Sequence, residues 1–141
     1  MARSATKTGI EKGQGTGFSK AFGSFSADDI PAAKEFYSNT LGLDVKEHMG
    51  GLGLNFENGM SVFIYPKPNH QAATFTVLNF YVSDIRATVS NLKAKGAEFE
   101  KYDGDVKTDE NGIMWGKESN HGPNIAWFKD PAGNILSIVE D

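Results

Sequence analysis

The sequence has 141 residues, of which 39% are apolar, and a formal net charge of −4, which suits one domain with a modest core. Its Lys and Arg residues are scattered rather than gathered on one face, which argues against a nucleic-acid partner. It contains no cysteine, so disulfides, Cys metal sites and Cys nucleophiles are excluded. No apolar run approaches the ~18 residues of a membrane span. The N-terminus lacks the apolar core of a signal peptide, so a cytoplasmic location is expected.

Residues 1–19 are rich in Gly, Ser, Thr and Lys, with Ile10 and Phe18 as the bulky apolar side chains. Such a segment cannot bury enough apolar surface to offset the entropy of ordering it. It is therefore expected to be a flexible tail, and residues 20–141 are expected to form one domain.

The domain begins with a predicted strand over 20–27 and a helix over about 29–41. Asp28 or Asp29 is placed to cap this helix, and Pro31 lies in its first turn, where a missing N–H costs little. One face of the helix carries apolar residues at helical spacing, namely Ile30, Ala33, Phe36, Tyr37 and Leu41. Gly42 is expected to end it.

Three strands follow this helix, over 45–49, 52–57 and 60–65. The last two flank Asn58-Gly59, a strong signal for a two-residue hairpin. The Gly50–Gly53 run lacks the following helix and the Lys-Ser/Thr pair of a phosphate loop, so that interpretation is rejected.

A linker over 66–73 leads to a second βαβββ pattern. Its predicted elements are a strand over 75–82, a helix over 84–95, a strand over 97–102, a short extended piece over 113–117, and a hairpin of 124–128 and 135–139. The turn Asp130-Pro131-Ala132-Gly133-Asn134 joins the last two strands.

The two halves resemble each other in sequence. Phe25-Ser26-Ala27-Asp28-Asp29-Ile30 is matched 55 residues later by Phe80-Tyr81-Val82-Ser83-Asp84-Ile85, which indicates a duplication. Since a half of roughly 55 residues is a marginal fold alone, modules 20–66 and 74–141 are expected to share a core or a site.

Three segments resemble the vicinal oxygen chelate superfamily, which includes glyoxalase I, bleomycin-resistance proteins and extradiol dioxygenases. They are Ala27–Ile30 with Phe36-Tyr37 and Leu41-Gly42-Leu43, then Val82–Ile85 with Gly96-Ala97, and finally Trp127–Asn134. The resemblance implies an α+β fold in which two tandem βαβββ modules form a curved mixed sheet, or cup, with helices on its outer face. It also implies a homodimer, because members of this family commonly pair through their modules.

Metal-dependent members of that superfamily place a His on the first strand and a Glu on the last strand of each half. The matching positions here hold Phe22 and Val77, then Phe63 and Ser137. These side chains are not the imidazole, carboxylate or thiolate donors that a divalent metal needs. No metal, cofactor or catalytic residue is therefore assigned, and His48, His70 and His121 are interpreted as loop or strand-end residues.

Alternation along the strands places further side chains on the face of these positions. The lining predicted for a ligand pocket is apolar and aromatic with hydroxyls and one amide: Phe22, Ser24, Phe63, Tyr65, Val77, Asn79, Tyr81 and Ser137. A filled core is the alternative, and Asn79 argues against it because a buried amide needs partners. Trp115 and Trp127 either cover the mouth or pack structurally.

The favoured hypothesis is a protein that binds a small, partly aromatic organic molecule without a metal, for sequestration or resistance. The alternative is a lyase, isomerase or dioxygenase of the same superfamily with a displaced metal site or a metal-independent mechanism. A third hypothesis is association with another protein through the sheet or helix faces. The expected partners are a small-molecule ligand and a second copy, with no nucleic acid and no membrane.

Overall fold

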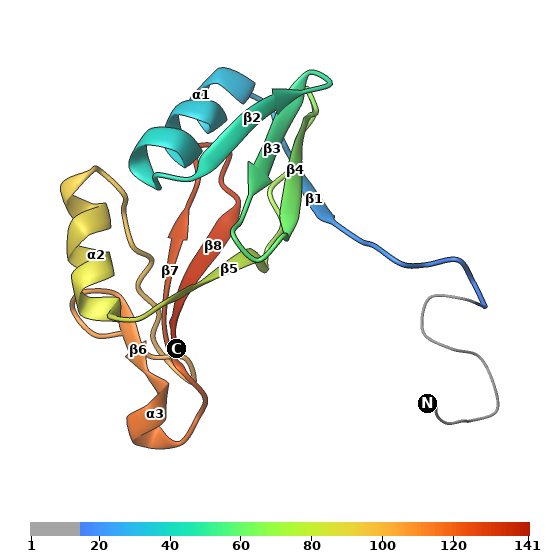
Figure 1. The fold of residues 1–141 in the computed structure, drawn as a ribbon. Helices are drawn as coiled ribbons and strands as arrows, with labels where there is room; N and C mark the ends of the chain where they lie inside the picture. Colours follow the sequence, from blue (N-terminus) through green and yellow to red (C-terminus); the bar gives the residue numbers. More distant parts are fainter. Residues whose placement is uncertain (1–14) are drawn as a thin grey trace.

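The computed structural model describes residues 15–141 and contains two four-stranded mixed sheets (Figure 1). The first module holds β1 (Gly23–Ala27), α1 (Ile30–Glu35), η1 (Phe36–Thr40), β2 (Asp44–His48), β3 (Gly51–Asn55) and β4 (Ser61–Pro66). Its strand order is β1-β4-β3-β2, with β1 parallel to β4 and the other pairs antiparallel.

The second module repeats this arrangement. It holds β5 (Thr76–Val82), α2 (Ile85–Ala94), β6 (Ile113–Trp115), α3 (Gly116–Ser119), β7 (Asn124–Lys129) and β8 (Ile135–Glu140). Its strand order, β5-β8-β7-β6, matches that of the first module strand for strand. The predicted α+β fold with two tandem βαβββ modules is therefore confirmed.

The helices α1 and α2 are each capped by an aspartate, and Asp29 is one of the two caps predicted for α1. Asp29 accepts a hydrogen bond from the Ala32 N–H and Asp84 accepts one from the Ala87 N–H, so each carboxylate satisfies a donor that the helix leaves open. The first helix changes after Glu35 into the π-helical turn η1. Gly42 then adopts a φ of 71°, a left-handed conformation that glycine tolerates and that stops the helix.

The strand predicted over 97–102 is wrong. Phe99 makes one isolated bridge to Phe128, and the Glu100 N–H donates to the Trp127 carbonyl. The reason is that β6 pairs with Asn124–Ala126 of β7 and becomes the fourth strand of the sheet. The extended piece predicted over 113–117 is this strand, although its last two residues belong to α3.

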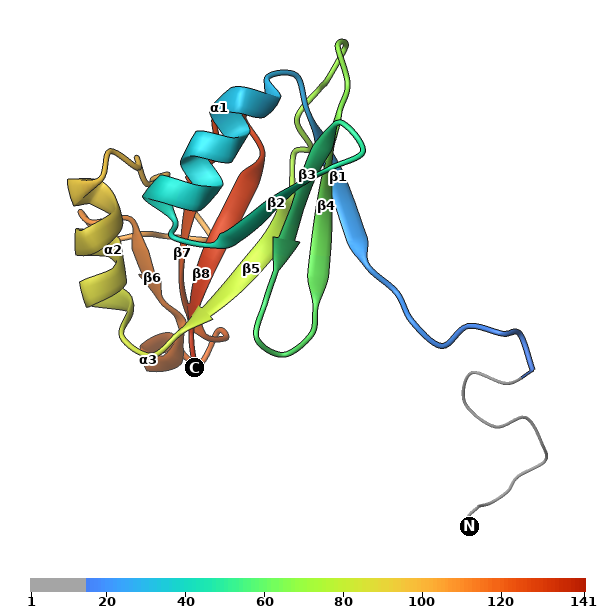
Figure 2. The same ribbon diagram turned by 45° about the horizontal axis from the view of Figure 1, so that its top comes forward.

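The two modules share one core. Apolar side chains from both sheets and both long helices form a single cluster, and in Figures 1 and 2 α1 and α2 lie on the same side of the sheets. Aromatic contacts join the modules at two places: Phe36 lies 6.3 Å from Phe128, and Phe56 lies 6.1 Å from Phe80, between ring centroids. Within residues 15–141, no helix covers the opposite face of either sheet.

A buried polar network also links the modules at the turn between β7 and β8. Asp130 accepts hydrogen bonds from the Tyr37 hydroxyl at 2.7 Å and from the Asn134 side chain at 3.0 Å. The same Asn134 amide donates to the Ser26 carbonyl at 3.0 Å. Burial, followed by the nearby Asp130 carboxylate, raises the pKa of Tyr37 far above its usual range. The turn motif therefore joins the modules.

His70, in the linker, lies between the same two modules. Its Nε2 is 3.0 Å from the Ala132 carbonyl and its Nδ1 is 2.6 Å from the Ser26 hydroxyl. Because a carbonyl can only accept, Nε2 carries a proton, and in the neutral imidazole Nδ1 then accepts from Ser26. His70 is half-buried and fixes the path of the linker.

The described part of the chain, 15–141, has no helix long and apolar enough to span a bilayer. Most of the predicted tail lies outside the described residues. Residues 15–22 form neither helix nor strand, so the first strand begins at Gly23 rather than at residue 20.

Candidate functional site

The uncovered face of the first sheet carries the residues predicted there. In the parallel pairing of β1 with β4, Ser24 lies opposite Phe63 and Ser26 lies opposite Tyr65. Phe22 precedes β1 on the same alternation, and it is 67% exposed. The sheet therefore brings Phe22, Ser24, Phe63 and Tyr65 onto one open surface.

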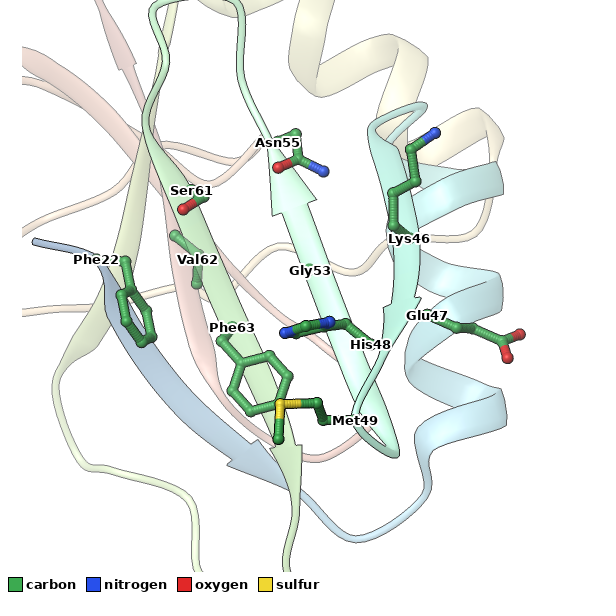
Figure 3. Close-up of a pocket in the computed structure, with 10 residues that line it drawn as sticks. All are labelled: Phe22, Lys46, Glu47, His48, Met49, Gly53, Asn55, Ser61, Val62 and Phe63. Carbon is green, nitrogen blue, oxygen red and sulfur yellow. The ribbon is translucent and has the colours of Figure 1, made fainter.

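A cavity of about 430 Å³ lies over this surface (Figure 3). Phe22 and Phe63 line it together with residues from β2 to β4, which are Lys46, Glu47, His48, Met49, Gly53, Asn55, Ser61 and Val62. The volume falls within the range typical of small-molecule sites, and the mixture of aromatic rings with a few polar groups is also typical of them.

Phe63 forms the centre of this cavity. Its ring packs edge-on against His48 with 5.9 Å between centroids, and Figure 3 shows the two side chains pointing toward each other. Gly51 makes room for this arrangement, since a Cβ there would lie 2.2 Å from the Ile64 carbonyl oxygen and 3.0 Å from the Phe63 ring. The glycine run thus permits close packing in β3.

Several lining residues were missed by the sequence prediction, which considered only the first and last strands of each module. Lys46 and His48, two residues apart on β2, share one face of the sheet, and Asn55 of β3 pairs with Ser61 of β4. The period-two pattern of the predicted strand over 45–49 was the signal that could have placed Lys46 and His48.

The side chain of Glu47 lies on the opposite face of β2 from those of Lys46 and His48. It pairs with Lys34 of α1 at 2.5 Å, and its carboxylate points away from Phe63 in Figure 3. The hydrogen bond from Lys34, followed by the charge of that lysine, lowers the pKa of Glu47. Over the cavity, the titratable side chains are therefore those of Lys46 and His48.

The uncovered face of the second sheet carries Asn79, Tyr81 and Ser137. Asn79 of β5 lies opposite Ser137 of β8, and the fully buried Ser137 hydroxyl donates to the Asn79 side-chain oxygen. Tyr81 shares the face of Asn79 on β5 and is 79% exposed. Val77 does not follow this alternation, because the β5–β8 register shifts between Thr76 and Leu78, and its half-buried side chain packs against the shared core. Trp127 lies opposite Ser137 on β7 and packs against Tyr102 at 5.3 Å.

The two groups of predicted residues do not meet in one cavity. The cavity beside Phe22 and Phe63 is lined only by residues between 22 and 63, all in the first module. Asn79 and Tyr81 are exposed on the second sheet and line a different cavity, which is described below. A single chain therefore presents two open surfaces rather than a closed cup.

The positions that hold a metal in related enzymes do not fit a metal here. Phe22, Phe63 and Val77 have no donor atoms, and Ser137 is buried with its hydroxyl donated to Asn79. Across residues 15–141, no three His, Cys, Asp or Glu side chains gather in a group that could hold an ion. Among the residues that line the first cavity, His48 and Glu47 carry metal-type donors, and Glu47 is paired with Lys34.

A family profile described as the glyoxalase/bleomycin resistance protein/dioxygenase superfamily matches residues 24–138. No curated protein matches the sequence significantly.

Solved structures share the fold at low sequence identity. The bleomycin resistance determinant encoded on transposon Tn5 has a TM-score of 0.62 and 17% identity, with 88% of this chain and 98% of that chain covered. TnmS3, an antibiotic-binding protein from Streptomyces sp. CB03234, has a TM-score of 0.58 and 21% identity, with 86% of this chain and 95% of that chain covered. Lactoylglutathione lyase from Agrobacterium tumefaciens has a TM-score of 0.59 and 18% identity, with 86% of this chain and 93% of that chain covered.

Proposed function

Since the chain belongs to the glyoxalase/bleomycin resistance protein/dioxygenase superfamily, we propose that it binds a small, partly aromatic organic molecule without a metal. The observation that carries this proposal is the cavity centred on Phe63, where aromatic rings stand at positions that hold metal ligands in the related enzymes. Shape and ring stacking are the forces available there, together with hydrogen bonds from Asn55, Ser61 and His48.

Two solved relatives support a role in sequestration or resistance. The Tn5 determinant confers resistance to bleomycin and TnmS3 binds an antibiotic, according to their descriptions. A protein of this kind needs only affinity, because holding the molecule removes it from its target. The cytoplasmic location expected from the sequence suits that role and stays a prediction.

A second copy completes the site in this proposal. Each chain exposes the Phe63 surface of one sheet and the Asn79 surface of the other. In a homodimer, the Asn79 surface of one copy covers the Phe63 surface of its partner and turns two open faces into cups. The contact also removes exposed aromatic side chains such as Phe22 and Tyr81 from water.

A metal-independent enzyme is the second candidate, favoured by His48. Its imidazole lies against Phe63 on the cavity side, and histidine is the side chain best suited to proton transfer near neutral pH. Turnover of a bound compound that is lost in His48→Gln while binding persists would favour this candidate over simple sequestration.

Calorimetry with a panel of aromatic compounds that includes bleomycin tests the proposed function. The expected result is saturable binding that is unchanged by EDTA or by added Zn²⁺, Ni²⁺ or Mn²⁺. Phe63→Ala should weaken binding by about tenfold, which corresponds to ~1.4 kcal/mol. Phe18→Ala removes an equally large exposed ring outside the cavity and should leave affinity unchanged. Binding that requires one equivalent of metal would contradict the proposal.

A further inference from the structure

A second cavity, of about 510 Å³, lies on the helix side of the second sheet, between the two modules. Its walls come from the segment after η1, the β3–β4 hairpin, β5 and α2; the lining residues used below are Phe56, Glu57, Met60, Phe80, Thr88 and Leu92. Asn79 and Tyr81 line it, but none of Phe22, Ser24, Phe63 or Tyr65 does. It is therefore separate from the cavity of the first sheet.

The base of this cleft is apolar and deeply buried. Leu78, Leu92, Phe128 and Ile138, each at most 9% exposed, form its floor. In the β5–β8 pairing Leu78 lies opposite Leu136 and Phe80 opposite Ile138, so these side chains belong to the helix-covered face. The Phe56–Phe80 contact is one wall. An apolar group that enters the cleft would pack against this contact and lose its own contact with water, which favours binding.

The mouth of the cleft carries polar side chains and one negative charge, that of Glu57. Exposed residues at the rim include Glu57, Asn58 and Met60. Glu57 is the only charged residue among those lining the cleft, and no Lys or Arg lines it. Consecutive residues 78–82 also line it, so the outer edge of β5, which has no neighbouring strand in its sheet, brings backbone carbonyls and amides to the rim.

We propose that this inter-module cleft is a second small-molecule site, which takes an amphiphile with an apolar body and a cationic amine end. The floor receives the apolar body, and the amine lies at the rim beside Glu57 and the carbonyls of β5. A carboxylate end is disfavoured, because it would lie beside Glu57 with no cationic side chain to pair with.

Calorimetry with decylammonium and decanoate, both below their micellar concentrations, tests the site. We expect saturable binding of decylammonium and weaker binding of decanoate. Glu57→Gln should lower decylammonium affinity by about two- to fivefold, as expected for an exposed charge pair. Glu110→Gln, the same charge change at an exposed position outside the cleft, should leave the affinity unchanged.

Filling the cleft distinguishes this site from the proposed cup. Thr88→Phe on α2 or Met60→Trp at the exposed hairpin should reduce decylammonium affinity at least about tenfold. Met60→Trp keeps the test valid if the helix variant does not fold. Phe63→Ala should weaken the aromatic ligand of the cup and leave decylammonium unaffected. Absence of saturation, equal binding of decanoate, or loss of decylammonium binding in Phe63→Ala would each overturn the proposal.

Discussion

At the scale of single residues, Asp130 shows how a turn residue joins two modules. Its Oδ1 accepts the backbone N–H groups of Ala132 and Asn134, and its Oδ2 accepts from Tyr37, which lies 93 positions earlier in the chain. A buried carboxylate is tolerated because each oxygen is hydrogen-bonded. The network therefore specifies both the turn and the position of α1 against it.

The raised pKa of Tyr37 predicts a loss of stability at alkaline pH. Its folded-state pKa lies above the unfolded value of ~10, so the folded state holds this proton while the unfolded state loses it. The contribution of Tyr37 is complete below pH ~10 and declines as pH rises further. Urea unfolding at several pH values should show a steeper alkaline fall for the native protein than for Tyr37→Phe.

The free energy of unfolding of Tyr37→Phe at pH 7 gives the reference for the alkaline comparison. The substitution removes one hydroxyl and leaves Asp130 with its remaining donors, so a loss of about 1–2 kcal/mol is expected there. Equal alkaline slopes for the two proteins would show that Tyr37 ionises in the folded state.

At the scale of elements, β6 depends on one side chain outside it. Asp109 accepts the backbone N–H groups of Asn111 and Ile113 and the indole N–H of Trp115 at 2.9 Å each. Arg86 of α2 lies over the Trp115 ring, 4.5 Å from its centroid. These contacts hold the short strand against β7, in the place that the predicted strand over 97–102 was expected to occupy.

Asp109→Asn should loosen this strand. Burial alone would raise the pKa of Asp109, but the hydrogen bonds from Ile113, Trp115 and Asn111, and the charge of Arg86, lower it. Because the folded pKa is depressed, its stabilising effect is present above pH ~4 and is lost as pH falls through the folded value.

Unfolding at several acidic pH values, followed by Trp fluorescence, checks the role of Asp109. We expect Asp109→Asn to lose roughly 1–2 kcal/mol at pH 7 and to depend less on pH below 4 than the native protein. Asp103→Asn, in the same loop and exposed, is the matched control. An acid profile unchanged by Asp109→Asn would contradict the assignment.

Local chemistry explains why much of the fold was predictable. The caps at Asp29 and Asp84 arise from residues next to them in the sequence. The hairpin predicted at Asn58-Gly59 also forms, but its connection runs from Phe56 to Met60 instead of over two residues. The strand over 97–102 failed because β6 and residues 97–102 compete for the same edge of β7. The role of His70 could not be predicted, because its partners, Ser26 and Ala132, come from opposite modules.

At the scale of the whole molecule, the residues predicted to line the pocket divide between two surfaces. The faces that carry Phe63 and Asn79 belong to different sheets. Which faces meet depends on how modules pack, and that is set by distant contacts such as Tyr37–Asp130 rather than by strand periodicity.

Mixing two variants tests whether copies share their sites. If each cup combines the Phe63 surface of one copy with the Asn79 surface of another, Phe63→Ala and Asn79→Ala homodimers each have two impaired cups. A mixed dimer then has one cup with both changes and one native cup. Since about half of the dimers in an equal mixture are mixed after exchange, native affinity should return at about a quarter of the site number.

Light scattering establishes the dimer, and calorimetry after subunit exchange counts the native sites. Phe63→Ala mixed with native protein controls for exchange. A monomer at all micromolar concentrations, or mixtures that never regain a native site, would contradict a shared cup.

Gly53 has a consequence for how ligand preference can change over time. It lies opposite Phe63 in the floor of the first cavity, and a Cβ placed there meets only the Lys46 carbonyl oxygen, at 3.8 Å. Gly51, two residues away, has no such freedom. Substitution of Gly53 by a residue with a small side chain can therefore make the cavity shallower during evolution. The backbone beneath Phe63 need not move for this change.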